Sequence, residues 1–137
     1  MSYSKIEDIR ALLRGAGAGT DVDNQITSAI SMADAEIDLR LGGVVNIKKA
    51  YEQKAPVIKD ISAYIAASIY LAMSMSSGQE NDAPQMAKYY REQAERLISS
   101  ILAGAPILDI DGNQITTASN ITRAMRSYTL NYLGVKS

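Results

Sequence analysis

Apolar residues recur every three or four positions in four stretches of the chain, which is the period of one face of an α-helix. We expect helices at about residues 4–14, 21–41, 56–77 and 82–103, separated by segments rich in glycine and polar residues. The predicted fold class is therefore mainly α: a small four-helix bundle with a short β-hairpin and an extended C-terminal arm. The bundle should span residues 1–106.

The helix ends carry recognisable signals. Ser4 and Glu7 have the spacing of a capping box at the start of the first helix. Asp21 or Asp23 can cap the second helix, and Gly42-Gly43 is expected to end it with positive φ. Residues 44–54 then read as a linking loop, with a strand-like start at Val44-Val45.

The second and third predicted helices carry the clearest apolar faces. The face of the second consists of Ile26, Ile30, Ala33, Ile37 and Leu41. The main stripe of the third consists of Val57, Ile58, Ile61, Ile65, Ile69 and Ala72. Residues 61–79 contain no charge and match the length of a membrane span, but serines and a glycine favour a buried central helix.

The fourth helix and the region after it differ in character. The buried face expected for this helix consists of Met86, Tyr90, Ala94, Leu97, Ile101 and Leu102, and Glu92 and Arg96 have favourable ion-pair spacing. Residues 107–117 read as a hairpin with Asp111-Gly112 in its turn. Residues 118–137 contain Arg123, Arg126 and Lys136 but no acid, which predicts an arm ordered by a partner.

Composition narrows the functional classes. The chain has no Cys and no His, so thiolate chemistry, disulfides and the commonest general base and metal ligand are absent. A net charge of −1 gives no global attraction for nucleic acid or an anionic membrane, and the N-terminus lacks the pattern of a signal peptide. We expect a cytoplasmically synthesised, non-enzymatic protein without a cofactor.

Several local patterns can be interpreted either as a chemical site or as ordinary local structure. The Gly15–Gly19 run lacks the remaining residues of a phosphate loop and is better read as a link. Asp109, Asp111 and Asn113 alternate like calcium ligands, but Gly112 between them favours a hairpin turn.

Three further groups concern surfaces. Asp34 and Asp38 share a helix face, which favours a solvated or subunit-facing edge over a metal site. Lys48-Lys49 is expected to be a solvated loop, with contact to DNA phosphate as the alternative. Tyr89-Tyr90 is expected to supply one core ring and one exposed ring rather than a platform for bases.

The order of these pieces resembles the head–tail connector, or head-completion adaptor, family of tailed bacteriophages. Ala33–Leu41 is similar to the end of a helix in that family, and Pro56–Ala66 to its Pro-led central helix. The fourth helix matches the family's spacing at Tyr90, Ala94, Leu97, Ile101 and Gly104. Arg123–Tyr128 resembles the family's basic and aromatic C-terminal segment.

The resemblance implies a virion protein of the neck. It would form a ring, most often twelvefold, beneath the portal protein, extend the channel through which double-stranded DNA passes, and dock the next neck or tail protein. The arm residues implied to grip the portal are Arg123, Arg126, Tyr128 and Tyr132. Interface residues would be Asp34, Asp38, Ile110, Asp111 and Ile115, with Lys48 and Lys49 as candidates for the DNA channel.

Two other interpretations stay open. The chain could be another neck or tail-completion subunit of a phage. It could also be a small helical regulatory or nucleic-acid-binding protein, although none of the four predicted helices is a basic recognition helix.

Overall fold

The computed structural model describes residues 2–13, 20–75 and 83–115. Within these ranges it contains five helices and no strand. The helices are α1 (Ile6–Leu12), α2 (Thr20–Leu41), α3 (Ile47–Glu52), α4 (Pro56–Met75) and α5 (Ala83–Leu102). The predicted mainly helical class is confirmed.

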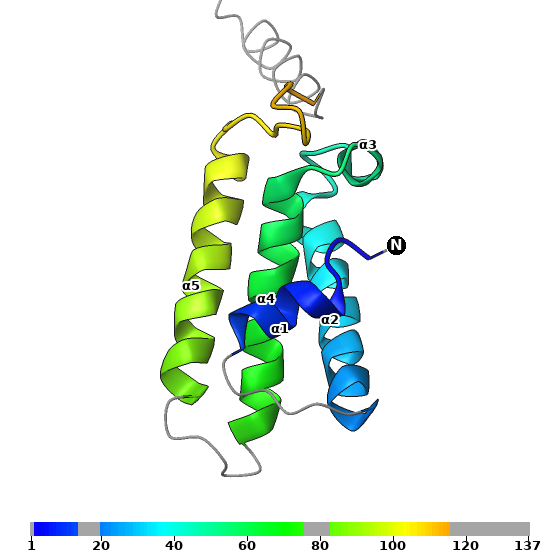
Figure 1. Ribbon diagram of the computed structural model, residues 1–137. Helices are drawn as coiled ribbons and strands as arrows, with labels where there is room; N and C mark the ends of the chain where they lie inside the picture. The colour runs from blue at the N-terminus through cyan, green and yellow to red at the C-terminus, as the bar shows by residue number, and fades with distance from the viewer. Residues whose placement is uncertain (1, 14–19, 76–82, 116–137) are drawn as a thin grey trace, which may run out of the picture.

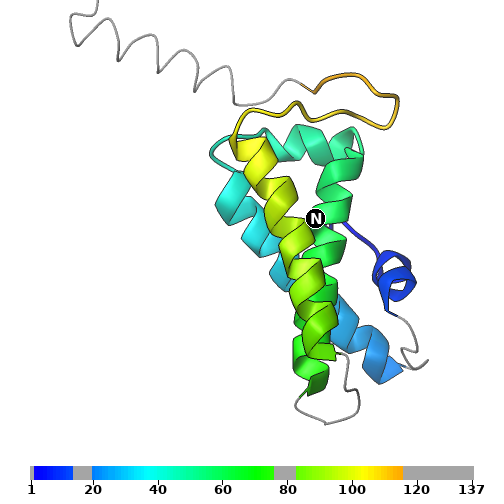
Figure 2. The same cartoon turned by 90° about the vertical axis from the view of Figure 1, so that its left-hand side faces the viewer.

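The long helix α4 lies at the centre of the arrangement. It packs against α5 on one side and α2 on the other, and the short α1 contacts both α2 and α4 (Figure 1). The colours along the chain show that α4 runs antiparallel to both of its long neighbours. The turned view in Figure 2 shows α1 outside the three long helices, with α3 near the end where α5 finishes.

The core follows the predicted helical period closely. All five residues predicted for the apolar face of the second helix are buried in α2. In α4, Ile58, Ile61 and Ile65 are buried, and Ala66 and Ala67 widen the contact so that neighbouring helices approach it on more than one side. Truncating one of these isoleucines to alanine would cost about 2–5 kcal/mol.

Two predicted core positions are wrong. Ala72 and Leu102 are exposed, and Ile98, which the prediction omitted, is fully buried. The buried face of α5 therefore passes through Ala94, Ile98 and Ile101, four and three residues apart. Leu102 lies at the last position of α5 and is 47% exposed.

One helix in the described part of the chain is long and apolar enough to cross a membrane by length and composition. This is α4, over the window Pro56–Met73, whose mean hydropathy is 1.2. Half of that window is buried inside the chain, where α4 contacts α2 and α5. These contacts are those of a central core helix.

The start of α1 differs from the predicted capping box. Lys5 is the residue that precedes the helix, and its backbone N–H donates to Asp8 Oδ2 at 2.8 Å. Ser4 is instead buried, and its hydroxyl lies 2.7 Å from that of Ser62 in α4. The capping-box pattern was therefore shifted by one residue, because packing against α4 takes the Ser4 side chain away from the helix end.

Residues 44–54 are not simply a loop, because they contain α3. Asn46 caps this helix by accepting the backbone N–H of Lys49 at 3.1 Å, and Ile47 and Ala50 anchor it in the core. The expected positive φ at Gly42-Gly43 is also wrong. Gly42 is needed for another reason: a Cβ there would lie 2.3 Å from the Asp38 carbonyl oxygen.

The predicted hairpin is reduced to a turn closed by an isolated antiparallel bridge between Leu108 and Gln114. Asp109 Oδ1 accepts the N–H groups of Asp111 and Asn113, both at 2.9 Å, and Gly112 has a φ of 86°. No strand forms in the described residues of this region. Residues 116 and 117, the arm at 118–137 and the link at 15–19 lie outside the described residues.

Candidate partner-binding surfaces

A buried polar cluster joins the N-terminal segment to α2 and α4. The backbone N–H of Tyr3 donates to Asp34 Oδ2 at 3.4 Å, and Ser62 Oγ donates to Asp34 Oδ1 at 2.8 Å. Ser4 Oγ lies 2.7 Å from Ser62 Oγ, and the Tyr3 hydroxyl donates to Asp38. Burial raises the pKa of Asp34 above its usual range, although its two hydrogen bonds oppose that change.

The position of Asp34 corrects a sequence-based prediction. Its side chain is 6% exposed and is occupied by contacts within the chain, so it does not form a solvated or subunit-facing edge. Asp38 does share a face with it, as predicted, since both receive hydrogen bonds from Tyr3. Asp38 itself lies at the surface. The two carboxylates therefore differ in role, because only Asp38 is accessible to a partner.

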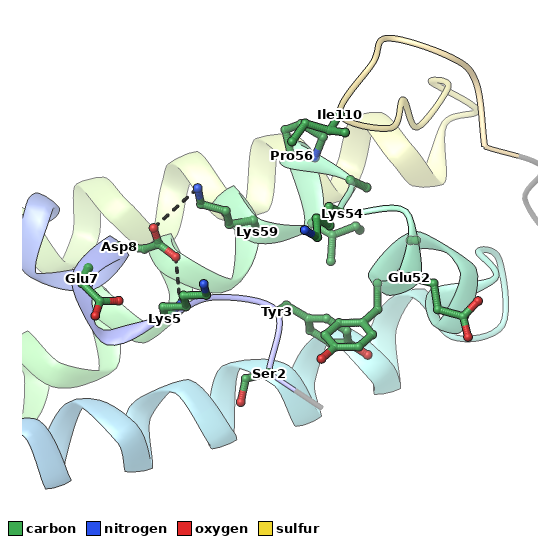
Figure 3. Close-up of a pocket in the computed structure, with 14 residues that line it drawn as sticks. Ser2, Tyr3, Lys5, Glu7, Asp8, Glu52, Lys54, Pro56, Lys59 and Ile110 are labelled. Carbon is green, nitrogen blue, oxygen red and sulfur yellow. Dashed lines mark hydrogen bonds and ion pairs between the residues drawn. The ribbon is translucent and has the colours of Figure 1, made fainter.

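A cavity of about 640 Å³ lies beside this cluster. The N-terminal segment, α1, α3 and the start of α4 enclose it, with Ile110 at its edge (Figure 3). Its apolar and aromatic lining consists of Tyr3, Ala50, Tyr51, Ala55, Pro56, Ile58 and Ile110. Its charged lining consists of Lys5, Lys54, Lys59, Glu7, Asp8 and Glu52. Because positive and negative groups are equal in number, the cavity has no strong preference for either sign.

Lys54 has an unusual backbone conformation at this cavity. Its φ is 53°, the left-handed region that L-residues rarely adopt. The Ala55 N–H donates to the Ala50 carbonyl at 3.0 Å, and the Lys54 N–H to the Tyr51 carbonyl at 3.1 Å. These bonds end α3 in a motif that usually has glycine at the left-handed position. Lys54 is therefore the one residue near the cavity whose backbone is strained among those described.

The described residues offer no group of three His, Cys, Asp or Glu side chains that could hold a metal ion. Asp109, Asp111 and Asn113, which alternate like calcium ligands, instead form the turn. Asp109 uses its side chain to fix two backbone amides.

An exposed stripe on α2 is the most distinctive surface. Ser28, Met32, Ala35 and Leu39 are spaced four, three and four residues apart, so they lie on one face, opposite the buried isoleucines. Leu39 is 85% exposed and Met32 is 53% exposed. We call these four residues the α2 stripe. Asp21 extends the same face towards the start of α2, and Asp38 lies along its edge.

Ion pairs on another side of α2 fasten it to α5. Arg40 donates to both oxygens of Glu95 at 2.6 and 2.7 Å, and Arg91 donates to Glu36 at 2.6 Å. The hydrogen bonds from Arg40 lower the pKa of Glu95 below its usual range. Glu36 and Glu95 are therefore used within the chain, whereas Asp38 accepts a hydrogen bond from Tyr3 and is still exposed at the edge of the α2 stripe.

The other predicted surface residues are dispersed. Lys48 is exposed and Lys49 half-buried, both on α3. Ile110 is 67% exposed and Asp111 is exposed, so both are accessible. Ile115 is buried, which contradicts its expected place at an interface. Its N–H donates to the Ile107 carbonyl at 2.7 Å, and the side chains of both residues are buried in the core.

The portal-arm residues Arg123, Arg126, Tyr128 and Tyr132 lie outside the described residues. Sequence reasoning missed the α2 stripe, although Met32 and Leu39 fall out of phase with the buried face and could have revealed it. It also missed the cavity, whose lining comes from segments far apart in the chain. No protein-family model, curated protein or solved structure matches this chain.

Proposed function

We propose that this chain is a structural virion protein, a head–tail adaptor of a tailed bacteriophage. It forms a homo-oligomeric ring under the portal protein, extends the DNA channel and docks the next neck or tail protein. The observation that carries the proposal is the α2 stripe, in which Leu39 and Met32 stand exposed on a long helix that the chain's own core holds in place. Apolar side chains that are exposed together on one helix face offer a surface that a second protein can cover.

The use of the chain's charged groups supports an assembly role. Of the three described carboxylates with shifted pKa values, Asp34 and Glu95 are bonded to other residues of the same chain and hold its elements together, and burial raises the pKa of the third, Asp60. In the described residues, no nucleophile, base and orienting group converge on one cavity in the way that catalysis needs. Recognition by complementary surfaces therefore accounts for these groups better than catalysis does.

Each accessible residue then has a role in the ring. Asp38, beside the α2 stripe, and the exposed turn residues Ile110 and Asp111 belong to subunit or partner interfaces. Arg123, Arg126, Tyr128 and Tyr132 belong to the arm that binds the portal protein. Lys48 and Lys49 lie on α3, where they meet the phosphates of DNA passing through the channel without sequence preference.

Electron microscopy of particles made by a phage with a nonsense mutation in this gene tests the proposal. We expect tailless heads that have lost DNA, together with free finished tails. Normal tailed virions would overturn the adaptor assignment. Heads joined to incomplete tails would also overturn it, in favour of a tail-completion subunit. As a control, supplying the intact gene from a plasmid should restore tailed virions.

The regulatory alternative has its own test. A nucleic-acid-binding protein should bind double-stranded DNA as the purified chain, with an affinity that falls steeply as salt increases. We expect no such binding before the ring forms, because α2, α4 and α5 do not present a basic face among the described residues. Tight, salt-sensitive binding by the isolated chain would contradict the adaptor proposal.

A further inference from the structure

We propose that residues 116–137 of the same chain cover the α2 stripe until the chain meets the portal protein. The C-terminal segment then acts in two places, first on its own α2 and later on the portal. This inference rests on the proposed function only for the identity of the second partner. The first contact is a property of the isolated chain.

Charge complementarity supports this pairing. The C-terminal segment contains Arg123, Arg126 and Lys136 but no Asp or Glu. Helix α2 contains five acidic residues and one Arg. Two of these acids, Asp21 and Asp38, are exposed on or beside the α2 stripe. Opposite charges around a binding surface set its register and attract the partner.

The apolar residues also correspond. The segment carries six large apolar residues, namely Ile121, Met125, Tyr128, Leu130, Tyr132 and Leu133. Met32 and Leu39 are the large apolar residues of the α2 stripe, and small side chains at Ser28 and Ala35 leave room beside them. Tyrosine and leucine side chains can cover such a surface while nearby arginines reach the carboxylates at its edge.

The path of the chain favours its own segment over that of a second copy. Ile115, the last described residue, is fixed by its bond to Ile107. The described segment that follows α5 lies at the end of the molecule where α5 and α2 both finish (Figure 1). Leu39 comes two residues before Leu41, the last residue of α2, so it lies near that same end. Residues 116–137 could extend about 70 Å, whereas α2 is about 33 Å long. A tethered segment acts at an effective concentration of about a millimolar.

The contact would explain how assembly waits for the portal. Because the same arginines and tyrosines serve both contacts, the portal protein and α2 compete for one segment. Docking to the portal withdraws the segment and exposes Met32 and Leu39 to the neighbouring subunit. A ligand that binds only one of two states shifts the population towards that state, so the portal drives ring closure.

The absence of Cys from the sequence permits a direct test. The double variant Leu39→Cys/Tyr128→Cys would be purified and oxidised at low protein concentration, and the disulfide mapped by mass spectrometry. Two control variants pair Tyr128→Cys with Tyr89→Cys or Leu102→Cys, which are exposed positions in the first half and at the end of α5. Together, these two controls show how much the length of the tether alone changes the rate of disulfide formation.

We expect an intramolecular disulfide between positions 39 and 128 to form at least about tenfold faster than in either control, and added salt to slow it because the contact is partly ionic. A rate no faster than the controls would overturn the inference. Disulfide-linked dimers as the main product would also overturn it, because they would show a second copy on the stripe. The experiment needs no phage, so its failure is distinct from failure of the adaptor proposal, which the nonsense mutant tests.

Discussion

Ser62 shows how a single side chain can connect three parts of the fold. Its hydroxyl donates to Asp34 in α2 and lies against the hydroxyl of Ser4, while Ser62 itself is in α4 and fully buried. Among the described residues, no buried side-chain nitrogen or oxygen lacks a hydrogen-bond partner. Removing one member therefore leaves the others without a partner at buried positions.

We expect Ser62→Ala to lower the free energy of unfolding by about 1–3 kcal/mol, because Asp34 and Ser4 each lose a buried partner. The matched control is Ser68→Ala. Ser68 is also buried in α4, but its hydroxyl bonds only to the Ile65 carbonyl of its own helix, so the control should cost less. Urea unfolding of both variants checks the difference, and equal losses would contradict this role for the cluster.

The backbone of Lys54 predicts a substitution that stabilises the fold instead of destabilising it. Glycine adopts a φ of +53° without the steric cost that a Cβ brings, so Lys54→Gly should raise the free energy of unfolding by about 0.5–1 kcal/mol. Lys54→Ala separates the backbone effect from the loss of charge and should give little gain. Thermal unfolding measures both. A destabilised glycine variant would mean that the Lys54 side chain contributes more than its backbone costs.

At the residue scale, the sequence predicted apolar burial better than polar burial. Ile26, Ile37 and Leu41 were identified because a buried helix face leaves a periodic trace. Asp34 leaves no such trace, since its burial depends on Tyr3 and Ser62, which lie 31 and 28 residues away. A pattern within one helix carries no information about a partner at that separation.

Between elements, α2 and α5 are joined by ion pairs that the sequence did not suggest. Spacing predicted a pair between Glu92 and Arg96 within one helix, whereas the closest carboxylate contacts of Arg40 and Arg91 cross from one helix to the other. In the structure Glu92 approaches Lys88, at 4.0 Å. Four-residue spacing identifies neighbours along a helix, and only packing determines which helices meet.

We expect Glu95→Gln to reduce the free energy of unfolding by about 0.5–1 kcal/mol at neutral pH, a modest value because both ion-pair partners remain partly solvated. Since the pKa of Glu95 is lower in the folded chain than its ordinary value of 4.5, this stability is present at neutral pH and is lost as pH falls through the folded pKa. The difference between variant and wild type should therefore shrink in acid.

Urea unfolding between pH 7 and pH 3.5 measures that change. The matched control is Glu92→Gln on the same helix, whose side chain is more exposed and lies 4.0 Å from Lys88. It should change stability by less than about 0.5 kcal/mol at every pH. A Glu95→Gln effect that did not depend on pH would show that the carboxylate's charge is not what joins α2 to α5.

Helix α3 shows why one element escaped prediction. It has six residues, too few for two full turns, so no periodic pattern could identify it. Its stability comes from the Asn46 cap and from Ile47 and Ala50 in the core. The turn after α5 was expected because Asp and Gly have specific turn conformations, but the strands expected beside it depend on contacts that local sequence does not specify.

For the whole molecule, the helical class and the central place of α4 could be predicted because they follow from length, period and the absence of charge in one stretch. The sequence shows that Met32 and Leu39 are out of phase with the buried face of α2, but it does not show that they stay uncovered. Only the packing of α2 against α4 shows which face is covered. The 85% exposure of Leu39 then becomes informative.

We expect Leu39→Asp to leave the free energy of unfolding of the helices within about 0.5 kcal/mol of wild type, because Leu39 is 85% exposed among the described residues and a contact with the C-terminal segment can be lost without unfolding the helices. Under the adaptor proposal, the same variant should fail to restore tailed virions to the nonsense phage, since a charge would be placed in a subunit contact. Leu102→Asp makes the same change on α5 and should restore them. Full rescue by Leu39→Asp would show that the stripe is not a subunit contact.

The buried cluster at Tyr3 and Ser4 also has a kinetic consequence. The hydrogen bonds of Tyr3 and Ser4 join residues 31 to 58 positions apart, so closing them requires α2 and α4 to be in place. Neighbouring helices joined by short connections form earlier, because less loop entropy is lost. The N-terminal segment should therefore dock after the folding transition state. Weakening its contacts would leave the folding rate nearly unchanged and accelerate unfolding. The contacts of the N-terminal segment therefore determine how long the chain stays folded.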